Sequence, residues 1–174
     1  MMKDIEIQYQ KTKIGDLIIG SYQNSLCLLD FRYRKMREVV DTRLKNGLNA
    51  RFVESTSNVI TATKRQLNEY LSGDRHEFTV PLVLVGSDFQ KKVWDALMEV
   101  GYGETASYLE LAKKINNEKA VRAVANANGA NAIGIIIPCH RIIGTNGSLT
   151  GYGGGLGVKK RLLQMEQNSQ MSLF

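Results

Sequence analysis

The N-terminal part of the chain consists of three short apolar segments separated by pairs of turn-forming residues, and this pattern limits the folds open to it. In order, the segments and turns are Ile5-Glu6-Ile7, Gly15-Asp16, Leu17-Ile18-Ile19, Gln23-Asn24 and Leu26-Cys27-Leu28-Leu29. Side chains along a strand alternate between the two faces of a sheet, and tight turns join antiparallel neighbours. The spacing therefore predicts an antiparallel meander of three strands.

Two helices and an extended segment are predicted after the meander. A polar helix is expected at about 34–46 and an amphipathic helix at about 58–71, with Gly73 just past its end. The segment 77–83 is predicted to be extended, because Pro81 lacks an N–H donor and disfavours helix before it.

Near residue 85 the pattern changes from strands to helices. Ser87 can cap a helix whose apolar side chains recur about once per turn. Ser107 and Glu110 form the capping box S-x-x-E, which predicts the start of a second helix.

A tight polar turn follows that second helix. Asn117 can cap the next helix, which ends at Gly129 and is rich in alanine. Two short helices joined by a tight turn are typical of a helix-turn-helix. Small side chains let such a helix approach a flat partner closely.

The last part of the chain is expected to hold a strand at 135–143, a glycine-rich loop at 144–155 and a helix at about 157–167. We therefore predict an α/β N-terminal domain with an antiparallel sheet plus helices (residues 1–85). A mostly helical, winged helix-turn-helix-like C-terminal domain follows it (residues 86–174).

Composition limits the classes of function. The net charge is +6 and the pI is about 9.3, which is compatible with a nucleic-acid partner but does not require one. The two cysteines form no disulfide framework or zinc-spaced cluster. The N-terminus lacks the apolar segment of a secretory signal, and no apolar stretch is long enough to span a membrane. We expect a soluble, cytoplasmic monomer without a cofactor.

The segment IIIPCHRII at 135–143 places reactive side chains in the most apolar run of the chain. A buried cysteine is usually a small hydrophobic residue, and we assign that role to Cys27. Cys139 differs because His140 follows it and could act as its base. Adjacent side chains in a strand point to opposite faces, so the pair needs a turn at Pro138 or a bridging water. A carboxylate is needed to orient the imidazole, and Glu166 is the only acid in the final helix.

Four segments of the chain, in this order, resemble one family. They are GYGETASY at 101–108, AVRAVANANGAN at 120–131, IIIPCHRIIGTNGSLTGYGGGL at 135–156 and KKRLLQME at 159–166. Together they are similar to the signature blocks of the O6-alkylguanine-DNA alkyltransferases, also called methylated-DNA–protein-cysteine methyltransferases. The resemblance covers about half of the chain, and the N-terminal half is similar only in its general α/β character.

The resemblance implies a transfer of the alkyl group from guanine O6 in double-stranded DNA to Cys139, once per molecule. His140 would activate Cys139 through a water, and Glu166 would polarise the imidazole. Tyr108 would protonate or hydrogen-bond the departing guanine. Asn131 would hold the turn before the active-site segment through hydrogen bonds. The target base would have to be flipped out of the duplex.

The resemblance also implies a set of contacts to DNA. Arg122 would fill the space that the flipped base leaves, with its helix in the minor groove. Asn117 and Thr145 are candidate phosphate contacts. Backbone groups of Cys139 and Ile142 would read the guanine edge, and Tyr152, Gly153 and Gly154 would line the base pocket.

The sequence departs from the family pattern in three places. Ala132 replaces the usual proline, which leaves that turn less rigid. Gly153 stands where some members have serine, so one donor to O6 is missing. Some relatives bind zinc in the N-terminal half, but Cys27 and His76 alone do not support a zinc site. Related proteins that do not transfer alkyl groups replace the nucleophile, whereas Cys139 is present.

Two other functions remain open from the sequence. A DNA-binding lesion sensor would use the helix-turn-helix without transfer, and a thiol hydrolase would use Cys139 on a small ester or peptide with turnover. The range of alkyl groups and the use of O4-alkylthymine are also open.

The C-terminal tail resembles the peptides through which bacterial proteins bind the DNA sliding clamp. Its residues are Gln170, Met171, Ser172, Leu173 and Phe174. Two apolar anchors at the end of a tail suit a peptide ligand. The alternative is a tail that folds back onto its own domain.

Overall fold

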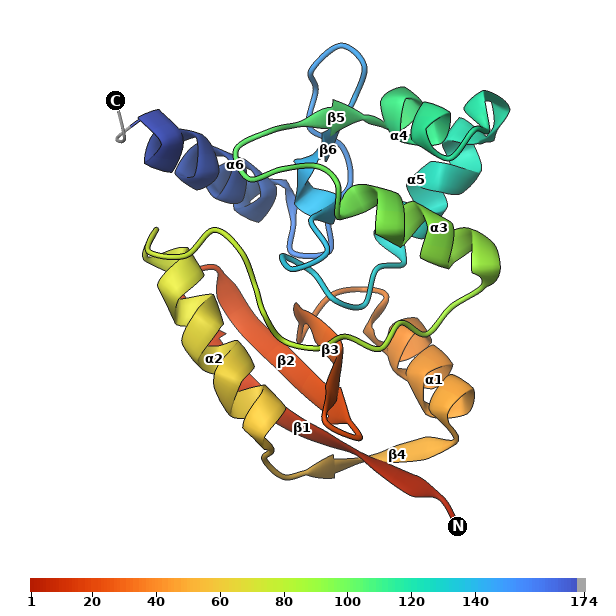
Figure 1. Ribbon diagram of the computed structural model, residues 1–174, viewed down its shortest axis with the longest axis vertical. Helices are drawn as coiled ribbons and strands as arrows, with labels where there is room; N and C mark the ends of the chain where they lie inside the picture. The colour runs from red at the N-terminus through yellow and green to blue at the C-terminus, as the bar shows by residue number, and fades with distance from the viewer. Residues whose placement is uncertain (172–174) are drawn as a thin grey trace. The chain divides into compact units, whose positions relative to one another are not determined.

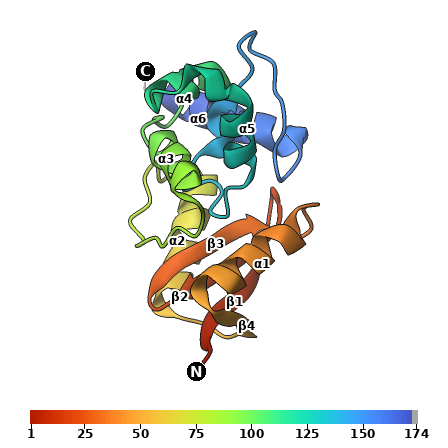
Figure 2. The ribbon, with the colours of Figure 1, turned by 90° about the vertical axis from the view of Figure 1, so that its right-hand side faces the viewer.

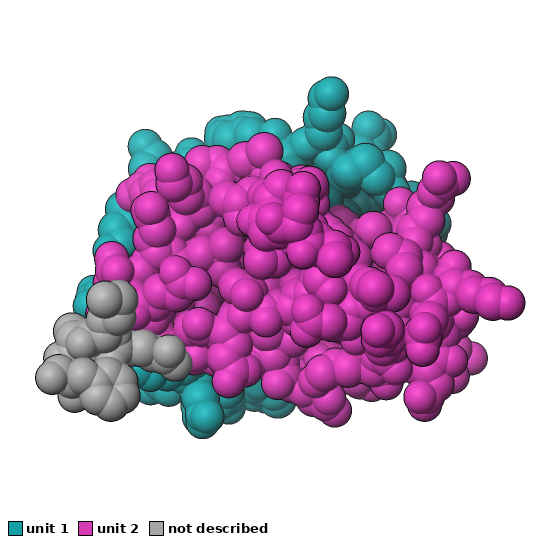
Figure 3. All heavy atoms as spheres, turned by 90° about the horizontal axis from the view of Figure 1, so that it is seen from above, with its two compact units in different colours: residues 1–86 teal, residues 87–174 magenta. Residues whose placement is uncertain are grey.

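The computed structural model of the chain describes residues 1–171. The last part of the predicted clamp-binding tail, residues 172–174, lies outside the described residues, so that contact stays a prediction. The chain forms two compact units, Met1–Gly86 and Ser87–Phe174, which Figure 3 shows in different colours.

A four-stranded sheet forms the centre of the first unit (Figure 1). Its strands are β1 (Lys3–Thr12), β2 (Gly15–Tyr22), β3 (Ser25–Phe31) and β4 (Ala50–Glu54). The antiparallel pairing of β1 with β2 and of β2 with β3 confirms the predicted meander.

The prediction of a purely antiparallel sheet is wrong at one edge, because β4 pairs parallel to β1 and makes the sheet mixed. The sequence gives little sign of β4, since only Ala50 of its five residues is buried. A strand with one fully buried side chain lacks the alternating apolar pattern by which strands are recognised.

Two helices complete the first unit, α1 (Arg37–Leu48) and α2 (Asn58–Leu71). Ser57 caps α2 by accepting a hydrogen bond from the Ile60 N–H. The buried face of α2 packs over β1, β2 and β3 (Figure 1). The predicted extended segment 77–83 is attached to β3, because the Leu26 N–H donates to the Pro81 carbonyl at 2.8 Å.

The second unit is mostly helical, as predicted (Figure 2). Its elements are α3 (Asp88–Leu97), β5 (Ala106–Ser107), α4 (Tyr108–Lys114), η1 (Glu118–Ala120), α5 (Val121–Gly129), η2 (Cys139–Arg141), β6 (Ile142–Ile143) and α6 (Leu156–Met171). The helices α3, α4 and α5 pack against one another. None of the helices in residues 1–171 is both long and apolar enough to cross a membrane.

The caps of the second unit confirm part of the sequence analysis. Ser87 and Ser107 both form complete capping boxes, with Gln90 and Glu110 respectively. The predicted cap by Asn117 is wrong, because its side chain makes no capping hydrogen bond. The chain there first forms the short 3₁₀ helix η1, in which only backbone groups satisfy the first turn.

The predicted strand at 135–143 is wrong except at its end, where Ile142 and Ile143 form β6. Its first part forms two successive tight turns, and its centre forms the 3₁₀ helix η2. Pro138 has φ −82° and ψ 63°, and the Cys139 N–H donates across it to the Ile137 carbonyl at 2.8 Å, which is an inverse γ-turn. Ile135 has φ +69°, a strained conformation for a β-branched residue. The β-branched residues gave the run a strand-like pattern, but the turns at Ile135 and Pro138 override it.

Candidate active site

The pairing of β5 with β6 brings two distant parts of the second unit together. Ala106 lies opposite Ile142, and Ser107 lies opposite Ile143. Tyr108 follows β5 directly as the first residue of α4, while β6 follows directly after η2, which contains Cys139. The site is therefore assembled from the N-terminus of α4, the η2 turn and α6.

His140 and Glu166 form a fully buried pair in this site. His140 Nε2 lies 2.8 Å from Glu166 Oε1, and both side chains have 0% exposure. This is the pairing that the sequence predicts between the η2 segment and the final helix.

Arg141, which the sequence analysis did not assign to the site, holds the same carboxylate. Its Nε donates to Glu166 Oε2 at 3.0 Å and its Nη2 donates to Oε1 at 2.9 Å. Its Nη1 donates to the Val100 carbonyl at 2.7 Å. This two-pronged geometry fixes the carboxylate in orientation as well as position.

The protonation states of the pair follow from these contacts. Burial alone would raise the pKa of Glu166, but hydrogen bonds from His140 and Arg141 lower it to about 2. Burial lowers the pKa of His140 and outweighs the opposite effect of Glu166. We therefore infer an ionised Glu166 next to a neutral His140. An ionised carboxylate only accepts hydrogen bonds, so Nε2 carries the imidazole proton and Nδ1 carries a lone pair.

Cys139 and His140 lie in the η2 turn and not in an extended strand, so the rule that adjacent side chains point to opposite faces does not apply to them. Cys139 lies at the start of the turn and is 9% exposed, whereas His140 is fully buried. Within residues 1–171, no protein group makes a hydrogen bond to Nδ1 of His140. This nitrogen is the basic atom of the neutral imidazole. A water between His140 and Cys139 would therefore donate its hydrogen bond to Nδ1.

Lys159 is the second site residue that the sequence analysis missed. This residue of α6 has 0% exposure, and its Nζ donates to the carbonyls of Ile142, Thr150 and Gly151 at 2.5, 2.8 and 3.5 Å. Burial lowers the pKa of Lys159, and its electrostatic interaction with Cys139 opposes that effect. A cation near a thiol favours the thiolate.

Tyr108 contacts the glycine-rich loop. Its hydroxyl donates a hydrogen bond to the Thr150 carbonyl at 3.2 Å. The Thr150 hydroxyl in turn donates a hydrogen bond to the Tyr108 oxygen, also at 3.2 Å. The loop therefore holds the predicted proton donor through both the backbone and the side chain of one residue.

Asn131 lies in the turn between α5 and η2, and it makes the kind of hydrogen bonds that the resemblance implies. It is 3% exposed, and its Nδ2 donates to the Ile137 carbonyl at 2.8 Å. Its Oδ1 accepts from the Ile133 N–H at 2.9 Å. These bonds attach Asn131 to the backbone on both sides of the strained residue Ile135.

The predicted lining of the base pocket lies beside this cluster. Ile142 is buried in β6, and its N–H donates to the Cys139 carbonyl. The rings of Tyr152 and His140 meet edge to face with their centres 6.4 Å apart. Gly153 and Gly154 follow Tyr152 in the half-buried part of the loop.

The predicted DNA contacts lie elsewhere on the second unit. Arg122, Asn117 and Thr145 are all exposed, and none of them belongs to the buried cluster. They come from α5, the residue before η1 and the start of the glycine-rich loop, respectively.

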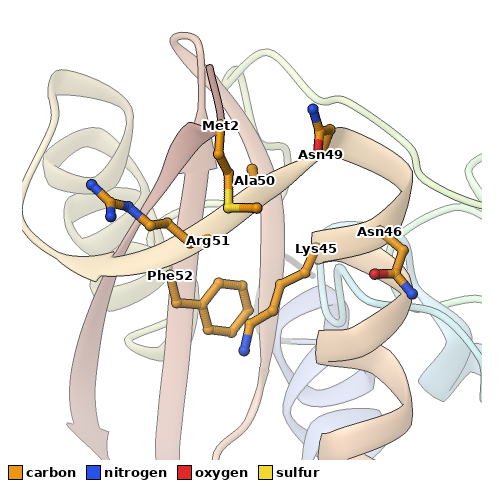
Figure 4. Close-up of a pocket in the computed structure, with 7 residues that line it drawn as sticks. All are labelled: Met2, Lys45, Asn46, Asn49, Ala50, Arg51 and Phe52. Atoms are coloured by element: carbon orange, nitrogen blue, oxygen red, sulfur yellow. The ribbon is translucent and has the colours of Figure 1, made fainter.

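Three other observations within residues 1–171 add no candidate chemistry. No group of three histidine, cysteine or acidic side chains in residues 1–171 could hold a metal ion. Burial raises the pKa of Cys27 to about 12, which fits its assignment as a structural residue. An open pocket of about 450 Å³ in the first unit is lined by Lys45, Phe52 and neighbouring residues (Figure 4), and it contains none of the predicted site residues.

Comparison with known proteins identifies the family. The DNA binding domain of 6-O-methylguanine DNA methyltransferase matches residues 88–168, and the ribonuclease-like domain of that protein matches residues 6–84. The methylated-DNA–protein-cysteine methyltransferase of Methanosarcina acetivorans is 43% identical over 90% of this chain and 94% of its own length.

Solved structures agree with this assignment. Mycobacterium tuberculosis O6-methylguanine methyltransferase is 38% identical, with a TM-score of 0.80 over 95% of this chain and 94% of that chain. Mycobacterium tuberculosis OGT in complex with DNA is 37% identical, with the same coverage and TM-score. The chain, with its ordered sequence blocks and its buried Cys-His-Glu arrangement, therefore belongs to the 6-O-methylguanine DNA methyltransferase family.

Proposed function

We propose that the protein repairs DNA by direct reversal, transferring the alkyl group, typically methyl, from O6-alkylguanine in double-stranded DNA to Sγ of Cys139. The observation that carries this proposal is the buried hydrogen bond between His140 and Glu166, next in the chain to a cysteine at the start of a turn. The activity named for the relatives and the DNA complex of a 37% identical neighbour support it.

The chemistry follows from the placement of the protons. The thiol proton of Cys139 passes through a water to Nδ1 of His140, and Glu166 stabilises the resulting imidazolium. The thiolate attacks the alkyl carbon, an S–C bond forms, and the C–O6 bond breaks with its electron pair going to guanine. Tyr108 gives its proton to the departing guanine, because the guanine anion is a poor leaving group. The proton on His140 then restores Tyr108.

Cys139 can reach the target guanine only if that base leaves the duplex. O6 of a stacked guanine is out of reach of a buried thiol, and flipping costs a few kcal/mol. We assign Arg122 on the exposed side of α5 to the vacated space, and Asn117 and Thr145 to the phosphates. Residues 86–174 would bind DNA and carry out the transfer, with residues 1–85 as support.

The carbonyls of Cys139 and Ile142 are the groups that we assign to the guanine edge. Their N–H donors are already used within the chain, whereas a carbonyl oxygen has a second lone pair for a donor on the base. Tyr152, Gly153 and Gly154 would line the pocket, where glycine allows close approach of the backbone to a flat ring.

The proposed reaction occurs once per molecule. Its product at Cys139 is a thioether, which has no good leaving group, and the only other cysteine is the buried Cys27. Each protein molecule would therefore be consumed by one transfer.

The test is to incubate the protein with a duplex oligonucleotide carrying one O6-methylguanine and then to measure the intact mass and map the modified peptide. One added methyl group on Cys139, at no more than one per protein, is expected. Cys139→Ser should keep DNA binding and lose transfer. Unmodified wild-type protein that still binds the lesion would instead favour a lesion sensor, and repeated product release without modification would favour a turning-over enzyme.

A further inference from the structure

Thr150 makes two hydrogen bonds to a residue 42 positions away in sequence. The Tyr108 hydroxyl donates to its carbonyl, and its side-chain hydroxyl donates to the Tyr108 oxygen, both at 3.2 Å. The Tyr108 oxygen thus has one defined donor and one defined acceptor on the same residue. The reaction steps proposed above give the Thr150 side chain no part.

A buried side chain of the second unit, and not the loop alone, fixes the position of Thr150. Lys159 Nζ donates to the Thr150 carbonyl at 2.8 Å and to the Ile142 carbonyl at 2.5 Å. Lys159 is fully buried on α6, and Ile142 belongs to β6, which is paired with the strand that precedes Tyr108. Both ends of the contact between Tyr108 and Thr150 are therefore fixed to the same framework.

We propose that Thr150 is a positioning residue for Tyr108, whose hydroxyl orients the phenolic oxygen and stabilises it as its proton moves to the departing guanine. This inference rests on the proposed alkyl transfer. It assigns to Thr150 no contact with the substrate, since the residue acts through Tyr108.

The effect belongs to the transition state and not to binding. Before transfer, the Tyr108 oxygen is neutral and its bond from Thr150 is an ordinary hydrogen bond. When the proton moves to guanine, the Tyr108 oxygen becomes negative and can no longer donate to the Thr150 carbonyl. The bond from the Thr150 hydroxyl remains and becomes charge-assisted, which roughly doubles the strength of such a bond. An interaction that is stronger in the transition state raises the rate without tightening substrate binding.

Four variants test the proposal in single-turnover transfer from O6-methylguanine duplex at saturating protein. Thr150→Val keeps the shape and removes the hydroxyl, whereas Thr150→Ser keeps the hydroxyl. Loss of one hydrogen bond predicts about a 5-fold slower transfer in T150V, with duplex affinity unchanged and T150S near the wild-type rate. Tyr108→Phe removes the group through which Thr150 acts, so the double variant T150V/Y108F should be no slower than Y108F.

Thr61→Val, at an exposed position of α2, is the matched control and should transfer at the wild-type rate. Circular dichroism and the thermal midpoint verify that T150V is folded. The proposal is overturned if T150V transfers at the wild-type rate, if T150S is as slow as T150V, or if T150V slows Y108F by the same factor as the wild type. A wild-type protein that transfers nothing to Cys139 would refute the proposed function instead.

Discussion

Glu166 is the residue on which the buried site depends most, because it accepts hydrogen bonds from both His140 and Arg141. Glu166→Gln removes the carboxylate charge that pairs with the buried Arg141, so the free energy of unfolding should fall by about 3–5 kcal/mol. The transfer rate should fall by about 100-fold or more, since His140 loses the group that stabilises its charged form. Urea unfolding and single-turnover kinetics measure the two effects.

Glu99→Gln is a suitable control, because Glu99 forms an exposed ion pair with Lys114 at 3.0 Å. An exposed pair of this kind contributes about 0–1 kcal/mol, and the transfer rate should not change. Equal effects of the two substitutions would mean that the buried pair has no special role.

The buried histidine predicts a stability that depends on pH. Burial lowers the pKa of His140, so the folded protein keeps it neutral where the unfolded chain, with the ordinary value of 6.5, already binds a proton. Stability is therefore complete above pH 6.5 and is lost as the pH falls below it, by at most about 1.4 kcal/mol per pH unit for one proton. Glu166 adds a further loss between its ordinary value of 4.5 and about 2.

Denaturant unfolding at a series of pH values measures this dependence. His140→Gln should flatten the curve just below pH 6.5. Thr61→Val, which changes no titratable group, is the control and should leave the curve as it is. An unchanged slope in the His140 variant would show that another group binds the proton.

At the residue scale, the sequence predicts the candidate reactive groups but not the side chains that hold them. Cys139, His140 and Glu166 are predicted from their chemistry and from the family blocks. Lys159 and Arg141 were missed, because a single cation in a sequence usually indicates an exposed side chain. A signal for Lys159 was present: with Leu162, Leu163 and Glu166 it follows the spacing i, i+3, i+4, i+7 of one helix face, and that face is buried.

At the scale of elements, the start of α4 links stability to chemistry. Ser107 caps α4 through the Glu110 N–H at 3.0 Å, and Tyr108 is the first residue of the helix. Ser107→Ala should cost about 1 kcal/mol of stability and also slow the transfer, because the same turn sets the position of Tyr108. Ser87→Ala removes the equivalent cap of α3 and should cost a similar amount without slowing the transfer. If Ser107→Ala and Ser87→Ala transfer at the same rate, the cap of α4 does not set the position of Tyr108.

The exposed side of α5 gives a second test at this scale. Arg122→Ala should slow transfer from duplex DNA by about 10-fold or more, since the space left by a flipped base would stay unfilled. Transfer from O6-methylguanine supplied as a free base should stay at the wild-type rate, because no duplex has to be opened. A similar loss on both substrates would place Arg122 in the chemistry or in folding.

The elements that the sequence predicts best are those with a local signal. The Ser87 cap of α3, the capping box of α4 and the amphipathic pattern of α2 all depend on residues within one or two turns. The η2 turn and the β4 edge depend on partners far along the chain, such as the hydrogen bonds from Arg141 to Glu166 and Val100 and the pairing of β4 with β1. Isoleucine-rich sequence before Cys139 favours a strand locally, and the contacts of the turn overrule that preference.

At the scale of the whole molecule, the net charge of +6 predicts the response of DNA binding to salt. Cations that neutralise phosphates release counterions, so affinity for duplex DNA should rise about tenfold or more from about 200 to 50 mM salt. Fluorescence anisotropy with a labelled duplex measures this change. The rate of transfer from a free base should stay nearly constant, since a neutral base brings no phosphates. Salt-independent DNA affinity would argue against binding through phosphates.

The complete burial of Lys159 makes its amine a chemical reporter. Lys160, its neighbour in the chain, is exposed and should be acetylated quickly by an amine-reactive reagent, whereas Lys159 is shielded and bound to carbonyls. Two adjacent amines of the same type thus differ in access and in their hydrogen bonds. The ratio of their labelling, measured by mass spectrometry, therefore reports how often the site opens, before and after the proposed alkyl transfer to Cys139.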